Sequence, residues 1–203
     1  MKAKQTNPDD RLRVEVKSRA ELHKWLAKNH ARKEAIWLVT WKKGGPVPHL
    51  PWPEIVDEAL CFGWIDSLPR KLDESRTMLL LSPRRAGSGW SAINKKKAEA
   101  LIAAGRIAPP GLAAIARAKK DGSWSKLDAA HALEMPADLA ASLAAAAPAT
   151  ANFTAFSPSS RRAILEWIGA AKKPETRAKR IAETAHLAQR NIKANHPNAR
   201  QAP

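Results

Sequence analysis

Cysteine is almost absent from this 203-residue chain. Cys61 is the only one, which excludes an intramolecular disulfide and any multi-cysteine zinc or iron–sulfur centre. Tyrosine is missing altogether, whereas tryptophan occurs eight times. No apolar run approaches the roughly 18 to 20 residues that a membrane span requires, and the N-terminal sequence has no apolar stretch of the signal-peptide type. We therefore expect a soluble, cytoplasmic protein without a membrane span.

Acidic residues are scarce relative to basic ones. The chain has 19 Asp and Glu against 35 Lys and Arg, so its formal net charge is +16. Residues 161–203 carry 10 basic and 3 acidic residues, which is nearly half of the excess in the last fifth of the chain. This imbalance favours a polyanionic partner. A hydrophobic content of 44% argues against wholesale disorder, and the length allows one domain or two small ones.

Helix and strand signals alternate in the first half of the chain. Ser18 followed three residues later by Glu21 is a capping-box pattern, which marks the start of a helix. The segment 34–43 is apolar on both faces and is expected in the interior of a sheet, whereas Pro69 is typical of an edge strand or a bulge. We expect helices over residues 19–29 and 54–62, and strands over residues 34–43, 64–72 and 77–82.

The second half has helical periodicity. Expected helices cover residues 92–104, 110–120, 136–147, 158–171 and 174–194, with a short turn near residues 150–156. The sequence thus predicts an α+β fold, with a small antiparallel sheet flanked by helices and followed by a C-terminal helical module. The expected parts are a flexible N-terminal arm over residues 1–17, an α+β domain over 18–108, the helical module over 109–194 and a disordered tail over 195–203.

A ligand-binding site is predicted from tryptophan, arginine and one carboxylate in the strand region. Arginine forks suit the carboxylate or phosphate of a ligand, and indole rings supply an apolar wall. The alternative is that the tryptophans belong to the core and that Asp66 pairs with a nearby arginine, namely Arg70, Arg84 or Arg85. Cys61 is expected to be an inert, buried thiol. The predicted ligand-binding residues are Trp37, Trp41, Trp64, Asp66, Arg84, Arg85 and Trp90.

A second candidate is a basic surface on the last helix. At 100° per residue, Ile181 and Ala185 fall on one side of this helix and the basic side chains fall on the other. Such a stripe suits the phosphates of nucleic acid or of anionic lipid, and its alternative is a solvated helix face. Two arginines flank the buried side, and Arg177 is expected to form an interdomain ion pair or to contact a ligand. The predicted anion-binding residues are Lys179, His186, Arg190, Lys193, Arg177 and Arg180.

Enzyme signatures are mostly missing. The chain has no glycine-rich phosphate loop, no nucleophile elbow and no histidines at metal-binding spacing. We therefore expect no catalytic residue, no metal and no cofactor. A spatial assembly of His49 with Asp66 or Glu58 stays open, because catalytic groups need not be neighbours in sequence.

Four segments together resemble the YdeI/OmpD-associated family, also called bacteriocin-protection proteins. They are EALCFGWID at residues 58–66, SPRR at 82–85, SGWSAIN at 88–94 and KPETRAKRI at 173–181, and the resemblance extends over roughly residues 18–192. It implies a small cytoplasmic bacterial protein that is linked to tolerance of antimicrobial peptides or bacteriocins and to an outer-membrane porin, with no established catalytic activity. A direct porin contact would require export, so regulation or precursor handling is the more acceptable link.

Three hypotheses follow from different classes of protein. The leading one is a noncatalytic accessory protein that binds a protein or a small anionic ligand at the tryptophan and arginine cluster. The second is a nucleic-acid-binding protein that uses the basic C-terminal helix, although no known nucleic-acid-binding motif is visible. The third is an unrecognised enzyme with a pocket around Asp66.

Overall fold

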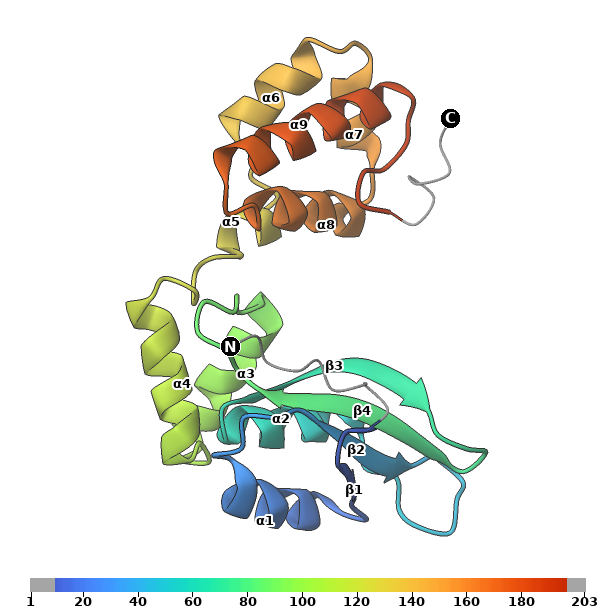
Figure 1. Cartoon of the computed structure of the whole chain (residues 1–203), viewed down its shortest axis with the longest axis vertical. Helices are drawn as coiled ribbons and strands as arrows, with labels where there is room; N and C mark the ends of the chain where they lie inside the picture. The colour runs from blue at the N-terminus through green and yellow to red at the C-terminus, as the bar shows by residue number, and fades with distance from the viewer. Residues whose placement is uncertain (1–9, 197–203) are drawn as a thin grey trace. The chain divides into compact units, whose positions relative to one another are not determined.

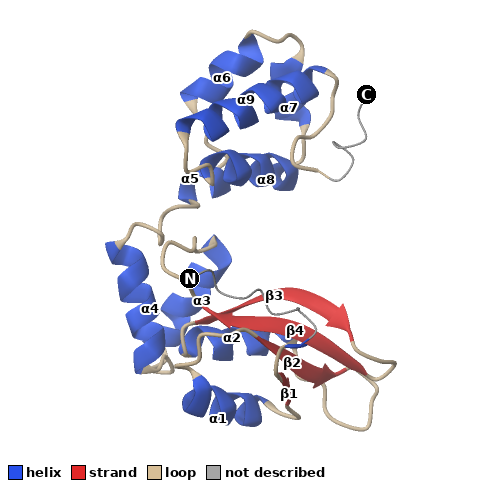
Figure 2. Ribbon diagram, viewed as in Figure 1, coloured by secondary structure: helices blue, strands red, loops and turns tan. Residues whose placement is uncertain are grey.

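The computed structural model describes residues 10–196, and the chain divides into two compact units between Ser125 and Lys126. The first unit combines a sheet with helices, and the described part of the second unit contains helices and no strand (Figure 2). The α+β class is therefore confirmed. The boundary lies later than the expected division at residues 108 and 109, because the helix that follows this division packs on the first unit.

The sheet has four strands in the order β1-β2-β4-β3 (Figure 1). As expected, β2 lies in the interior and β3 at an edge, where the pairing with β4 is irregular between Asp66 and Pro69. The sheet is mixed rather than antiparallel, because β1 pairs with β2 in parallel. The strands are β1 (Arg13–Glu15), β2 (Ile36–Trp41), β3 (Trp64–Lys71) and β4 (Arg76–Pro83).

Strand β1 lies within the segment that the sequence assigned to a flexible arm. Val14 and Val16 are both buried in the main core, and Val16 N donates a hydrogen bond to the Val39 carbonyl. The expectation of a flexible arm is therefore wrong for this stretch, because burial of two valines and pairing with β2 hold it in place. Residues 1–9 of the predicted arm lie outside the described residues.

Four helices of the first unit begin and end close to where the sequence places them. They are α1 (Arg19–Asn29), α2 (Trp52–Cys61), α3 (Ala92–Ala103) and α4 (Pro109–Lys120). The Ser18 hydroxyl accepts a hydrogen bond from Glu21 N, as the capping box predicts. Gly63 ends α2 with a positive φ of 73°, which a side chain would disfavour. Helix α4 contacts α2 so closely that a Cβ on Gly111 would lie 2.4 Å from the Cys61 carbonyl oxygen.

The main core of the first unit lies between the helices and one face of the sheet. Leu22 and Leu26 of α1 and Ile55 of α2 contribute to it, together with Leu38 and Leu79 of the sheet. A smaller cluster of Trp37, Val39 and Met78 forms on the other face, because successive side chains along a strand point in opposite directions.

The second unit packs around a separate apolar core that includes Leu139, Phe153 and Ile168. Its helix α7 replaces the turn expected near residues 150–156, and the short α5 was not expected. The last helix ends five residues early because Asn191 takes a positive φ of 58°. Most of the predicted tail, residues 197–203, lies outside the described residues. The helices are α5 (Asp128–His131), α6 (Ala137–Ala144), α7 (Ala149–Ala155), α8 (Pro158–Gly169) and α9 (Pro174–Gln189).

Candidate functional site

The predicted tryptophan cluster does not assemble into one pocket. Trp37 and Trp64 are 1% and 0% exposed and belong to separate clusters, Trp37 in the small one and Trp64 in the main core. The Trp64 indole N–H donates to the His30 carbonyl oxygen at 3.1 Å. Trp41, which is half-buried, donates to a carboxylate oxygen of Glu15. Trp37 and Trp64 therefore pack in apolar clusters, as the alternative interpretation predicted, rather than forming the wall of a ligand pocket.

Asp66 has a hydrogen-bond partner that the sequence did not suggest. Its carboxylate accepts a hydrogen bond from the Trp52 indole N–H at 2.8 Å. Trp52 is the first residue of α2 and remains 46% exposed. The sequence did not single out Trp52. Its pairing with Asp66 depends on the position of the edge strand β3 relative to α2, which no local sequence signal gives.

Arg84 and Trp90 do come together as predicted. The guanidinium carbon lies 3.7 Å from the centre of the Trp90 ring, and Nη1 donates a long hydrogen bond to the Gly89 carbonyl. Arg84 is only 6% exposed, and its buried Nε has no hydrogen-bond partner among the described residues. Burial lowers the pKa of Arg84 to about 10, and the charge of Asp66 only partly offsets this effect. Within residues 10–196, Arg84 forms no ion pair with a carboxylate.

The next residue, Arg85, is exposed and lines an open hollow of about 300 Å³. Ser82 and Ser88 also line it, so a guanidinium and two hydroxyl groups surround the same space. Hydrogen-bond donors of this kind fit the oxygens of a carboxylate or phosphate. Because the hollow is open, only part of a ligand would be enclosed by it.

Several hydrogen bonds hold the loop that carries Arg84 and Arg85. Arg84 N donates to the Gly63 carbonyl at 2.9 Å, and Gly87 N donates to the Asp121 carboxylate at 3.0 Å. Hydrogen bonds from Ser123, together with that of Gly87, hold the pKa of Asp121 below its usual value. Arg117 donates to the Arg84 carbonyl. On the loop itself these contacts use backbone groups, which leaves the Arg85 side chain as a donor toward the hollow.

A tryptophan that the sequence did not single out extends this region. Trp124 lies with its ring centre 4.9 Å from that of Trp90, and the ammonium groups of Lys95 and Lys119 lie over its ring. Cations thus gather around both indoles, as the negative ring faces favour. The surroundings of Arg84 are therefore cationic on the side of α3 and α4 as well.

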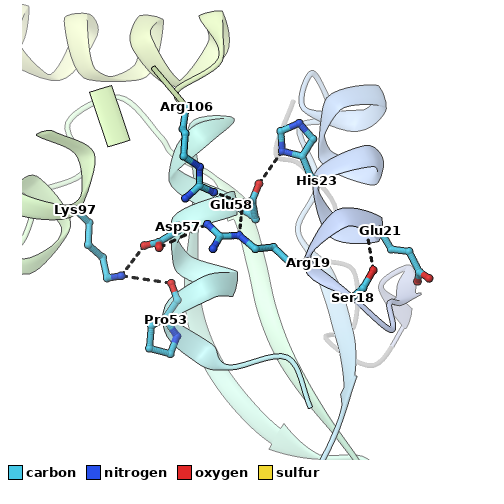
Figure 3. Close-up of polar contacts among 9 residues, drawn as sticks. All are labelled: Ser18, Arg19, Glu21, His23, Pro53, Asp57, Glu58, Lys97 and Arg106. Atoms are coloured by element: carbon cyan, nitrogen blue, oxygen red, sulfur yellow. Dashed lines mark hydrogen bonds and ion pairs between the residues drawn. The ribbon is translucent and has the colours of Figure 1, made fainter. Parts of the chain in front are cut away.

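A second cluster, centred on Glu58, was not predicted as a unit (Figure 3). Glu58 is 2% exposed on α2, and its Oε1 accepts hydrogen bonds from Arg19 Nε and Arg106 Nη2, both at 2.7 Å. His23 Nδ1 lies 2.8 Å from Oε2. An acidic residue within the apolar run EALCF is the signal that could have indicated a paired, buried charge.

The Glu58 cluster links three separate segments. Arg19 and His23 come from α1, and Arg106 follows α3, so the one carboxylate holds both to α2 (Figure 3). Although burial opposes it, the hydrogen bond from Arg19 to Glu58 raises the pKa of the arginine. Both oxygens of Glu58 are engaged, so the cluster is best explained as an ion-pair junction. His49, which the sequence left open as a partner of Glu58, contacts the Trp41 carbonyl instead.

The basic side chains of the last helix do not form one continuous stripe. Arg177 forms a two-pronged ion pair with Asp138 of α6, at 2.7 and 2.9 Å, and this pair lowers the pKa of Asp138. The expected interdomain ion pair of Arg177 is therefore wrong, because an acidic partner is available within its own unit. Arg180 lies over the Trp167 ring and donates to the Trp167 carbonyl.

Three of the other four predicted anion-binding residues, Lys179, His186 and Arg190, are exposed. Lys179 and His186 are exposed on α9, whereas Arg190 and Lys193 follow the end of that helix. Lys193 is half-buried, with its ammonium group 5.9 Å from the Phe156 ring centre. Lys179 and His186 thus lie on the helix, as the sequence predicted. Arg190 and Lys193 lie beyond its end, so they do not share its geometry.

The described residues contain no group of three or more His, Cys, Asp or Glu side chains that could hold a metal ion. Within the same residues, no helix combines the length and the apolar character needed to cross a membrane. Cys61 is buried, and burial raises the pKa of its thiol to about 11.

The two units match different models of protein families. Residues 14–114, which make up most of the first unit, match a model described as "Domain of unknown function (DUF8412)". Residues 132–191 match the family described as "Bacteriocin-protection, YdeI or OmpD-Associated". Neither the curated proteins nor the solved structures gave a match.

The second unit therefore contains a region, residues 132–191, that matches the YdeI/OmpD-associated family model. The predicted resemblance is confirmed for this region, which contains KPETRAKRI, and not for the whole span of residues 18–192. The segments EALCFGWID, SPRR and SGWSAIN lie within the part of the chain that matches the other model. The two matches thus cover separate parts of the chain, residues 14–114 in the first unit and residues 132–191 in the second.

Proposed function

We propose that this chain is a noncatalytic cytoplasmic accessory protein that supports tolerance of antimicrobial peptides or bacteriocins by binding a small anionic ligand. The match of residues 132–191 to the bacteriocin-protection family supports the biological setting. The ligand binds in the hollow beside Arg85 in the first unit, which we name the Arg85 hollow. Its lining includes Ser82, Arg85 and Ser88.

The observation that carries this proposal is the burial of Arg84 without a carboxylate partner. A guanidinium that is 6% exposed has lost most of its hydration, and the ring of Trp90 replaces only part of it. Buried charges are usually paired, because an opposite charge offsets the cost of desolvation. The Arg85 hollow is lined by Pro83 and Arg85, the two chain neighbours of Arg84, so an anion bound there would bring a negative charge to the same loop. A charge pair is weakened less by solvent when one of its members is buried.

The chemistry of the hollow sets the class of ligand. Arg85 offers a planar fork of N–H donors, which matches the paired oxygens of a carboxylate or phosphate. Two serine hydroxyl groups complete the set. The shared ligand chemistry is thus a small oxyanion, and inorganic phosphate and succinate are probes for its two common forms.

Isothermal titration calorimetry with these two probes tests the proposal. We expect the wild-type protein to bind at least one of them, and Arg85→Ala to weaken that binding about tenfold or more, because a charge-assisted pair of hydrogen bonds is lost. Arg13→Ala is the matched control, since Arg13 is an exposed arginine of β1 and does not line the hollow. Equal weakening by both variants would show that only the overall positive charge matters and would contradict the site.

The biological part of the proposal needs a separate measurement. In a bacterium whose own copy of the chain has been deleted, survival after bacteriocin treatment should be restored by the wild-type chain and by Arg13→Ala. Arg85→Ala should fail to restore it at equal protein level. If Arg85→Ala protects fully although it no longer binds the probes, the ligand site does not serve tolerance.

A further inference from the structure

A second cavity lies on the helix-covered side of the sheet, away from the Arg85 hollow. It has a volume of about 230 Å³, and its lining includes His49, Trp52, Ile55, Pro69, Thr77 and Leu79. Along β2 and β4 the main core ends at the Leu38 and Leu79 pair, and the next pair on the same face, Thr40 with Thr77, borders the cavity.

The edge strand β3 opens this space. Its pairing with β4 shifts between Asp66 and Pro69, so that two residues of β3, Ser67 and Leu68, face Leu80 alone. Pro69 lines the cavity. Bulges of this kind bend a strand and redirect its side chains. Asp66 stands immediately before the shift and holds the indole of Trp52 through its hydrogen bond of 2.8 Å. The half-exposed Trp52 ring is thereby fixed at the border of the cavity.

His49 is the polar group that gives the cavity a preferred ligand. Its Nδ1 lies 2.8 Å from the Trp41 carbonyl oxygen, and a contact with a carbonyl requires an N–H at this nitrogen. In the neutral ring, Nε2 is then an acceptor, and no described residue bonds to it. The residue is half-buried and lines the cavity, so a ligand with an O–H or N–H group can donate to Nε2.

The cavity is partly open to solvent, and its volume limits the size of the group that it can enclose. A cavity of about 150 Å³ lined by aliphatic and aromatic side chains is sufficient for benzene, whereas drug-sized molecules need about 300 Å³ or more. A space of about 230 Å³ therefore encloses one aromatic ring with a small substituent. We propose that this cavity binds a small phenol-like molecule, with its ring against Ile55 and Leu79 and its hydroxyl donating to His49 Nε2.

Nuclear magnetic resonance of the tryptophan indole N–H groups provides a direct test with phenol and toluene as probes. We expect phenol to shift the Trp52 signal saturably while the Trp167 signal of the second unit stays in place. Toluene lacks the donor and should bind about 2- to 10-fold more weakly, the range expected for one hydrogen bond. Absence of a Trp52 shift up to the solubility of phenol, or equal affinity for the two probes, would overturn the proposal.

Two variants locate the interaction. In His49→Leu the preference for phenol over toluene should disappear while both still bind, and Asp66→Ala should weaken both because Trp52 is released. Persistence of the preference in His49→Leu would overturn the role of that ring nitrogen. Backbone amide spectra check that each variant is folded. Arg85→Ala should leave phenol binding unchanged, so this result is independent of the anion site.

Discussion

Arg84 lies against Trp90, with 3.7 Å between the guanidinium carbon and the centre of the ring, and has no carboxylate partner among the described residues. Arg84→Met keeps most of the side-chain volume and removes the buried charge. We expect the free energy of unfolding in anion-free buffer to change by less than about 1 kcal/mol or to rise, because an apolar side chain of similar size often replaces a buried ion without loss. Urea denaturation measures this change.

Arg84→Ala separates packing from charge. Truncation of a side chain that is 94% buried leaves a void, and we expect a loss of about 2 to 4 kcal/mol. A similar loss in Arg84→Met would show that the guanidinium itself is needed for folding, which would contradict the view that its charge is kept for a ligand.

Glu58→Gln tests the ion-pair junction of the first unit. The variant keeps the shape of the side chain but leaves Arg19 and Arg106 without their counter-charge. The loss should be about 2 to 3 kcal/mol, below the 3 to 5 kcal/mol typical of a broken buried pair, because both arginines are partly exposed and screened by solvent. Urea denaturation checks this, and Asp57→Asn serves as the control because that neighbour is more exposed. Equal losses in the two variants would argue against a special role for Glu58.

Gly111→Ala tests the close approach of α4 to α2. The new Cβ would lie 2.4 Å from the Cys61 carbonyl oxygen and 2.8 Å from that of Leu60, and both neighbours are backbone atoms that cannot rotate away. We expect a loss of about 2 to 3 kcal/mol from the overpacking. Gly45→Ala is the control, since its nearest contact would be 3.4 Å, and thermal unfolding compares the two. If Gly111→Ala left the unfolding temperature unchanged, this result would contradict the assignment of α4 to the first unit.

The Asp138–Arg177 pair predicts a pH dependence in the second unit. Its hydrogen bonds lower the pKa of Asp138, so the pair contributes stability above the unfolded pKa of about 3.9, and this contribution is lost as the pH falls through the lower folded value. In Arg177→Met the stability of the second unit should depend less on pH below about pH 4. Urea midpoints across this range measure the effect, with Lys179→Met as the charge-matched control. If Arg177→Met left the dependence of the urea midpoint on pH unchanged, the Asp138–Arg177 pair would not be its cause.

Local sequence signals predicted most of the fold. The Ser18 cap and the edge position of Pro69 each rest on the chemistry of one or a few neighbouring residues, and the structure confirms both. Strand β1 was missed because three residues are too short for a periodic signal, and only its pairing with β2 defines it. The helix α4 was placed correctly, but its attachment to the first unit depends on a long-range contact at Gly111.

The site was less predictable for the same reason. Proximity of Arg84 to Trp90 follows from a short loop, whereas the separation of Trp37 from Trp64 depends on which face of the sheet each strand residue takes. Glu58 pairs with a residue as far as 48 positions away, so no local pattern could identify its partners.

A titration of the isotope-labelled protein with inorganic phosphate, followed through its backbone amide signals, tests the Arg85 hollow most directly. The account predicts saturable shifts centred on residues 82–88, which Arg85→Ala abolishes and Arg13→Ala preserves. Shifts scattered over lysines and arginines throughout both units, or no shifts at all, would contradict it.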